Sequence, residues 1–75
     1  MNEKIIELAA KVLGVDLDVV RQHNKYVAEI AAWYCWSPER GGKAVIITDT
    51  GERLAANSSI SFNKHVEEFK NGRRN

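Results

Sequence analysis

The sequence contains a single cysteine, Cys35, among its 75 residues. One cysteine excludes an intramolecular disulfide and any zinc site built from several cysteines. Small secreted domains usually carry disulfides, so we expect this chain in a reducing cytoplasm. No stretch reaches the roughly 18 apolar residues of a membrane span. The first residues, Met1 to Lys4, lack the basic start and long apolar run of a signal peptide.

Net charge is also nearly absent. Eleven Lys and Arg residues against ten Asp and Glu residues give a formal charge of +1. This balance provides no long-range attraction to nucleic acid or to an anionic membrane, so such binding would need a local cluster of basic residues. We expect residues 1–72 to form one small domain, followed by a polar tail at residues 73–75. A core of this size gives little stability, and dimerisation would add to it.

Apolar residues at helical spacing predict a helix over residues 3–13. Asn2 is a suitable N-cap for it, and Gly14 fits the left-handed position beyond its end. Asp16 predicts the start of a second, short helix, and Asn24 is a suitable place for that helix to end.

The second half of the chain predicts strands and then a helix. Residues 43–49 are rich in β-branched side chains, Thr50-Gly51 forms a tight turn, and residues 53–57 return as another strand. A last amphipathic helix follows, with Ser61 as its N-cap and an apolar stripe of Phe62, His65, Val66 and Phe69.

Residues 26–36 fit two patterns, because their apolar side chains match both strand and helix spacing. The aromatic-rich end and the turn residues at 37–42 favour a strand. The predicted fold is therefore an α+β domain in the order helix, short helix, three-stranded antiparallel meander, helix. Both amphipathic helices are expected to pack on one face of the sheet and to leave the other face open.

The run Trp33-Tyr34-Cys35-Trp36 indicates a binding surface. On a strand, Trp33 points away from the side shared by Tyr34 and Trp36, so at least one large aromatic should lie on the open face. Arg40 and Lys43, on the adjoining Gly-rich loop, could hold an anion. The candidate surface for a partner consists of Trp33, Tyr34, Trp36, Arg40 and Lys43. The alternatives are that all the aromatics are buried and that the loop is a plain hairpin connection.

The start of the last helix offers a weaker candidate for anion binding. Helix N-termini present unpaired amides and a partial positive charge, and here Ser59, Ser61 and Lys64 lie close in sequence. Ordinary capping by Ser61 explains the same residues without a ligand.

Catalytic and metal sites are not predicted. His65 falls on the apolar stripe of the last helix, which is typical of a packed, hydrogen-bonded core histidine. A zinc site would have to combine His65 with His23 and Cys35, and nothing in their spacing indicates it. A nucleophilic Cys35–His65 pair would need an exposed, activated thiol, for which the strand offers no signal. We expect no cofactor.

The leading hypothesis is a non-catalytic protein-interaction module, which could be a homodimer. The alternative is an RNA-binding module, because double-stranded RNA-binding domains share the order helix, three strands, helix. Those domains have basic residues at the start of the last helix, where this chain has only Lys64. A small enzyme using Cys35 and His65 is the third hypothesis.

Overall fold

A computed structural model describes residues 1–39, 42–57 and 59–75. It confirms an α+β fold with an antiparallel sheet. The elements in chain order are α1 (Glu3–Leu13), α2 (Leu17–Gln22), β1 (Asn24–Val27), the single 3₁₀ turn η1 (Ala28–Ile30), β2 (Ala32–Trp36), β3 (Lys43–Ile47), β4 (Arg53–Asn57) and α3 (Phe62–Lys70). None of the helices in these ranges has the length and apolar character needed to cross a membrane.

The sheet has four strands in the order β1-β2-β3-β4, so the predicted three-stranded meander is wrong. The segment expected to be one strand is broken in its middle. The amide of Ala31 donates to the Ala28 carbonyl at 3.1 Å, and Ala31 itself adopts a left-handed conformation with φ of 49°. This tight reversal turns the chain back, and Tyr26 of β1 then pairs with Trp33 of β2.

The local signals for helix ends are largely confirmed. Asn2 Oδ1 accepts a first-turn amide of α1 at 2.9 Å, and Gly14 closes that helix with φ of 70°. Ser61 Oγ accepts a first-turn amide of α3 at 3.2 Å. Asp16 occupies the N-cap position of α2, but its side chain makes no capping hydrogen bond.

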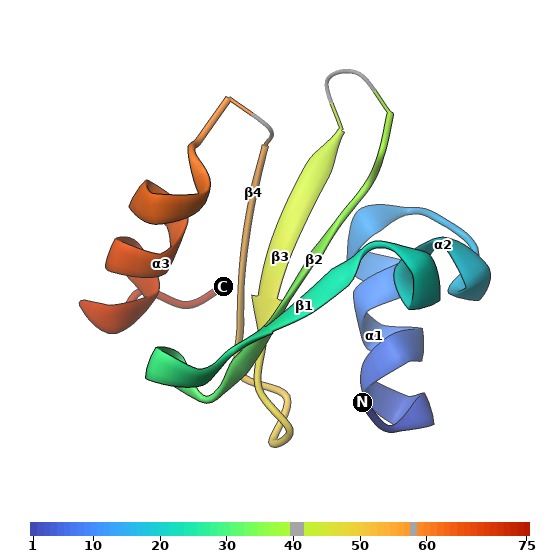
Figure 1. The fold of residues 1–75 in the computed structure, drawn as a ribbon, viewed down its shortest axis with the longest axis horizontal. Coiled ribbons are helices and arrows are strands. Elements are labelled where there is room, and N and C mark those ends of the chain that lie inside the picture. Colours follow the sequence, from blue (N-terminus) through green and yellow to red (C-terminus); the bar gives the residue numbers. More distant parts are fainter. Residues whose placement is uncertain (40–41, 58) are drawn as a thin grey trace.

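The helices lie on opposite faces of the sheet, contrary to the prediction that one face would be open. Figure 1 shows the sheet nearly edge-on, with α1 and α2 on one side and α3 on the other. The reason is the composition of β3, in which Val45, Ile46 and Ile47 are consecutive and fully buried. Successive strand residues point to opposite faces, so an uninterrupted apolar run needs cover on both.

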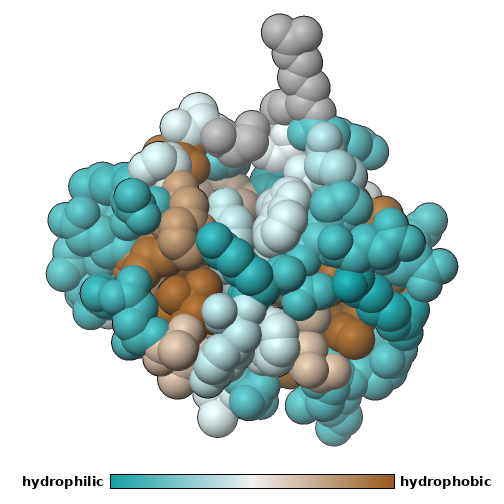
Figure 2. Space-filling model, viewed as in Figure 1, coloured by the Kyte–Doolittle hydropathy of each residue, from teal (hydrophilic) through white to brown (hydrophobic). Residues whose placement is uncertain are grey.

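Each face of the sheet therefore has its own hydrophobic core. The α1-side core consists of Ile5, Ile6, Ala9, Ala10, Leu13, Val20, Cys35, Val45 and Ile47. The α3-side core consists of Val27, Ala32, Ile46, Leu54, Val66 and Phe69. Figure 2, drawn from the same side as Figure 1, shows apolar side chains (brown) on both sides of the sheet, while the outer helix surfaces are hydrophilic.

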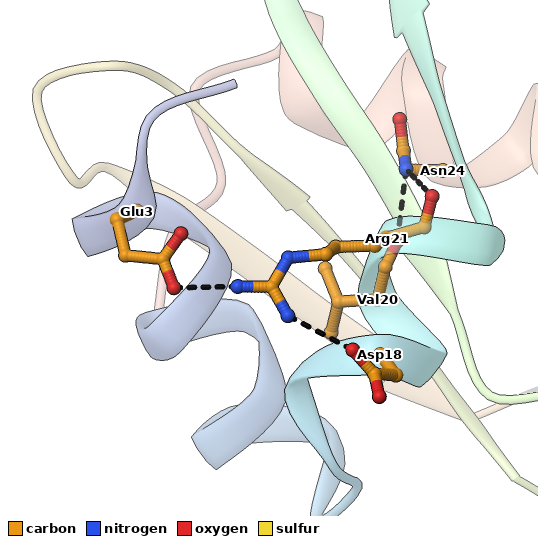
Figure 3. A network of polar contacts seen from close by, with 5 residues as sticks. All are labelled: Glu3, Asp18, Val20, Arg21 and Asn24. Carbon is orange, nitrogen blue, oxygen red and sulfur yellow. Dashed lines mark hydrogen bonds and ion pairs between the residues drawn. The ribbon is translucent and has the colours of Figure 1, made fainter.

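Arg21 joins three elements at the edge of the α1-side core (Figure 3). Its guanidinium lies 2.6 Å from a Glu3 carboxylate oxygen in α1 and 3.0 Å from an Asp18 oxygen in α2. The next strand is attached beside it, because Asn24 Nδ2 donates to the carbonyls of Val20 at 2.8 Å and of Arg21 at 3.1 Å. These contacts fix the end of α2 against α1 and set where β1 begins.

Candidate functional site

The sheet register divides the aromatic run between the two faces, as the sequence predicted. Trp33 packs against the α1-side core, with the ring of Tyr26 at 5.0 Å from its own. Tyr34 and Trp36 point to the face that carries α3. All of the run is at least half-buried, whereas Tyr26 is 51% exposed. Helices on both faces therefore leave only part of each aromatic surface accessible.

A groove lies on the α3 face of the sheet, at the end where β2 leads into the hairpin. Its volume is about 360 Å³, close to the lower end of the range of about 300–1,000 Å³ found for ligand pockets. The lining residues, which define the β2–α3 groove, are Lys25, Tyr34, Trp36, Ser37, Lys43, Ala44 and Phe62. The groove exists because α3 buries Val66 and Phe69 farther along the sheet, and only its first residue borders this end.

Three aromatic rings form the apolar wall of the β2–α3 groove. The Tyr34 ring meets the Phe62 ring edge to face, with centroids 4.8 Å apart at 90°, and lies 5.7 Å from the Trp36 ring. Lys25 Nζ stands 3.9 Å from the centroid of Phe62, a cation–π contact across the groove. Burial raises the pKa of the Tyr34 hydroxyl, so this group keeps its proton over the physiological range.

The structure brings together three of the five residues predicted for the binding surface. Tyr34, Trp36 and Lys43 line the same groove. Trp33 does not join them, because the alternation of β2 sends it to the α1 face. Arg40 lies outside the described residues.

Two residues of the groove were missed by the sequence interpretation. Lys25 is opposite Tyr34 in the pairing of β1 with β2, and the prediction of one strand over residues 26–36 does not contain that pairing. Phe62 was assigned only to the apolar stripe of the last helix. The signal that could have found Lys25 is its position two residues before the buried Val27 on the same strand, since residues i and i+2 share a face.

The weaker anion site has intramolecular partners for each of its groups. Ser61 Oγ caps α3, and the Ser59 hydroxyl and amide both bond to Asn57 Oδ1. Lys64 Nζ lies 3.2 Å from a Glu68 carboxylate oxygen. Capping and local pairing thus account for this segment.

Cys35 and His65 do not form a pair, because they lie in cores on opposite faces of the sheet. Cys35 is fully buried in the α1-side core, and burial raises the pKa of its thiol to about 11. His65 is 1% exposed and its Nε2 is 2.7 Å from the Leu54 carbonyl, which confirms the prediction of a hydrogen-bonded core histidine. His23 Nδ1 contacts the Val19 carbonyl at 2.9 Å. Within residues 1–39, 42–57 and 59–75, no three His, Cys, Asp or Glu side chains are grouped to hold a metal ion.

In comparisons with known proteins, no protein-family model, no curated protein and no solved structure matches the chain.

Proposed function

We propose that this protein is a non-catalytic binding module that holds a segment of a partner protein in the β2–α3 groove. The single observation that carries the proposal is the convergence of Tyr34, Trp36 and Phe62 on one concave, partly exposed surface. Aromatic side chains are enriched at the centres of protein interfaces, where they supply contact area at low entropic cost. We also propose a cytoplasmic location, because Cys35 is a free thiol and small secreted domains usually carry disulfides.

The size and openness of the groove favour a short segment over a whole domain face. A space of about 360 Å³ accommodates a few side chains rather than a standard interface. Recognition of an extended peptide through one or two anchoring side chains is a common use of such surfaces.

Binding of single-stranded RNA is the second candidate. Lys25 and Lys43 border the same aromatic wall, and aromatic rings next to cations are the usual elements of single-strand recognition.

The proposal is tested by selecting peptides from a random phage-displayed library on the immobilised protein. The selected sequences are then synthesised and their affinities are measured by calorimetry for the wild type, for Trp36→Ala and for Tyr26→Ala. Tyr26 is the matched control, because it is an exposed aromatic on the opposite face. We expect Trp36→Ala to weaken binding by about tenfold or more, as for an interface anchor, and Tyr26→Ala to leave it unchanged.

Recovery of no specific peptide would contradict the proposal, and so would peptides that bind Trp36→Ala and the wild type equally.

A further inference from the structure

The cations at the β2–α3 groove have no carboxylate partner among the described residues, as is also the case for Lys4, Lys11 and Arg53. Of the other described basic side chains, five lie within 3.3 Å of a carboxylate oxygen: Arg21, Lys64, Lys70, Arg73 and Arg74. Among the described residues, no carboxylate forms an ion pair with Lys25 or Lys43, and none lines the groove. The groove thus presents positive charge that internal pairing does not neutralise.

The position of Lys25 directs this charge into the groove. Its ammonium stands over the ring of Phe62 at 3.9 Å, while its backbone is paired with Tyr34 on the neighbouring strand. A cation–π contact at an accessible site is weak. A carboxylate of a ligand can therefore form an ion pair with the Lys25 ammonium without breaking a strong internal interaction.

The ring geometry favours an inserted side chain over a stacked base. Stacking needs an accessible ring face, but one face of Phe62 is covered by Lys25. The Tyr34 ring is surrounded by Phe62 at 90°, His65 at 79° and the tilted ring of Trp36. A compact aliphatic or aromatic side chain fits between such rings more readily than a planar base stacks on them.

Charge over the whole protein also favours a peptide over a nucleic acid. Affinity for nucleic acid rises with the number of phosphates that are neutralised. Among the described residues, the cations that line the groove are Lys25 and Lys43, and the whole chain carries +1. Two cations are instead a good match for one or two carboxylates beside an apolar anchor.

We infer that the partner segment is an acidic peptide in which an apolar side chain lies next to one or two Asp or Glu residues. The inference rests on the proposed function and names the chemistry of its ligand. The apolar side chain occupies the space between Tyr34, Trp36 and Phe62, and the carboxylates pair with Lys25 and Lys43.

The test compares matched short peptides by NMR titration of the isotope-labelled protein. One peptide has a central Leu flanked by Glu residues, and its control replaces every Glu by Gln. We expect the acidic peptide to shift the Trp36 indole signal and to bind about fivefold more tightly than the Gln peptide at low salt, with the difference shrinking as salt is added. In the double variant Lys25→Gln/Lys43→Gln, the two peptides should bind alike.

The outcomes separate this inference from the proposed function. If phage-selected peptides depend on Trp36 but carry no excess of Asp or Glu, the acidic preference is wrong and the proposed function stands. If neither titrated peptide shifts the Trp36 signal and no selected peptide depends on Trp36, both are wrong. If a single-stranded oligouridine shifts the groove signals and the peptides do not, the ligand is nucleic acid and the inference is overturned.

Discussion

The side-chain amide of Asn75 pairs with the backbone of Ala55 in the way that a neighbouring strand would. Asn75 Oδ1 accepts from the Ala55 amide at 3.0 Å, and Asn75 Nδ2 donates to the Ala55 carbonyl at 3.2 Å. The backbone amide of Asn75 donates in addition to the Arg53 carbonyl at 2.9 Å. The outward-facing polar groups of Ala55 and the carbonyl of Arg53 are thereby satisfied. This part of an otherwise unpaired sheet edge, which is a common cause of aggregation, is covered.

We predict that Asn75→Ala exposes the edge of β4. Two exposed hydrogen bonds are lost, so the free energy of unfolding should fall by about 1 kcal/mol. Hydrogen exchange at the Ala55 amide should accelerate, and sedimentation should show concentration-dependent association. Asn63→Ala, at an exposed position on α3, is the control and should change neither measurement. An Ala55 amide that stays equally protected in Asn75→Ala would show that the pairing does not cover this edge.

Ala31 is the site of a predicted stabilising substitution. It is exposed and adopts φ of 49°, a conformation that costs an L-residue about 1–2 kcal/mol and glycine almost nothing. After the larger entropy loss of glycine on folding is subtracted, Ala31→Gly should raise the free energy of unfolding by about 0.5 kcal/mol. Chemical denaturation measures this change. Ala28→Gly, in the adjacent 3₁₀ turn without a positive φ, should instead lower stability.

The two tryptophans should respond differently to truncation. Trp33 packs against the α1-side core, so Trp33→Ala should cost about 2 kcal/mol or more of stability in urea denaturation. Trp36 lines the β2–α3 groove, and Trp36→Ala should cost less than half as much stability while weakening peptide binding by about tenfold or more. Equal losses of stability in the two variants would show that Trp36 is a core residue rather than a binding residue.

Burial of Cys35 should make stability depend on pH in the alkaline range. Its thiol pKa is raised from 9.0 to about 11, so the folded state holds the proton more tightly than the unfolded state. The protonated thiol therefore contributes fully to the free energy of unfolding below about pH 9. That contribution is lost as the pH rises from about 9 to about 11, at up to about 1.4 kcal/mol per pH unit. Denaturation of wild type and Cys35→Ala across this range isolates the effect, because lysines and tyrosines titrate in both proteins. Parallel pH profiles would contradict it.

The elements with strong local signals were predictable from the sequence. The amphipathic spacing of residues 3–13, with Asn2 and Gly14 at its ends, gave α1 its bounds, and Ser61 marked the start of α3. Capping and periodicity are local properties, so a single sequence contains them. The break at Ala31 could not be predicted, because no Gly or Pro marks it and the run of apolar residues continues through it.

The arrangement of helices and the groove depended on information of a different kind. The consecutive buried residues of β3 did contain a signal for cover on both faces, which the open-face interpretation did not use. Prediction of the groove also requires the pairing register of the strands, because Lys25, Tyr34 and Phe62 come from three separate elements. Pairing register is a long-range property, and a one-residue shift would exchange the faces of Tyr34 and Trp33.

The position of β3 between two cores has a consequence for how this molecule opens. Its buried residues alternate between the α1-side core and the α3-side core, so neither core can unfold without exposing one face of β3. We expect the β3 amides to exchange with solvent only when the whole chain unfolds, and those of α3 to exchange through a smaller opening in which that helix lifts from the sheet. Such an opening would move Phe62 away from the groove while β2 stayed in place, so the local motion of α3 would change the shape of the binding surface.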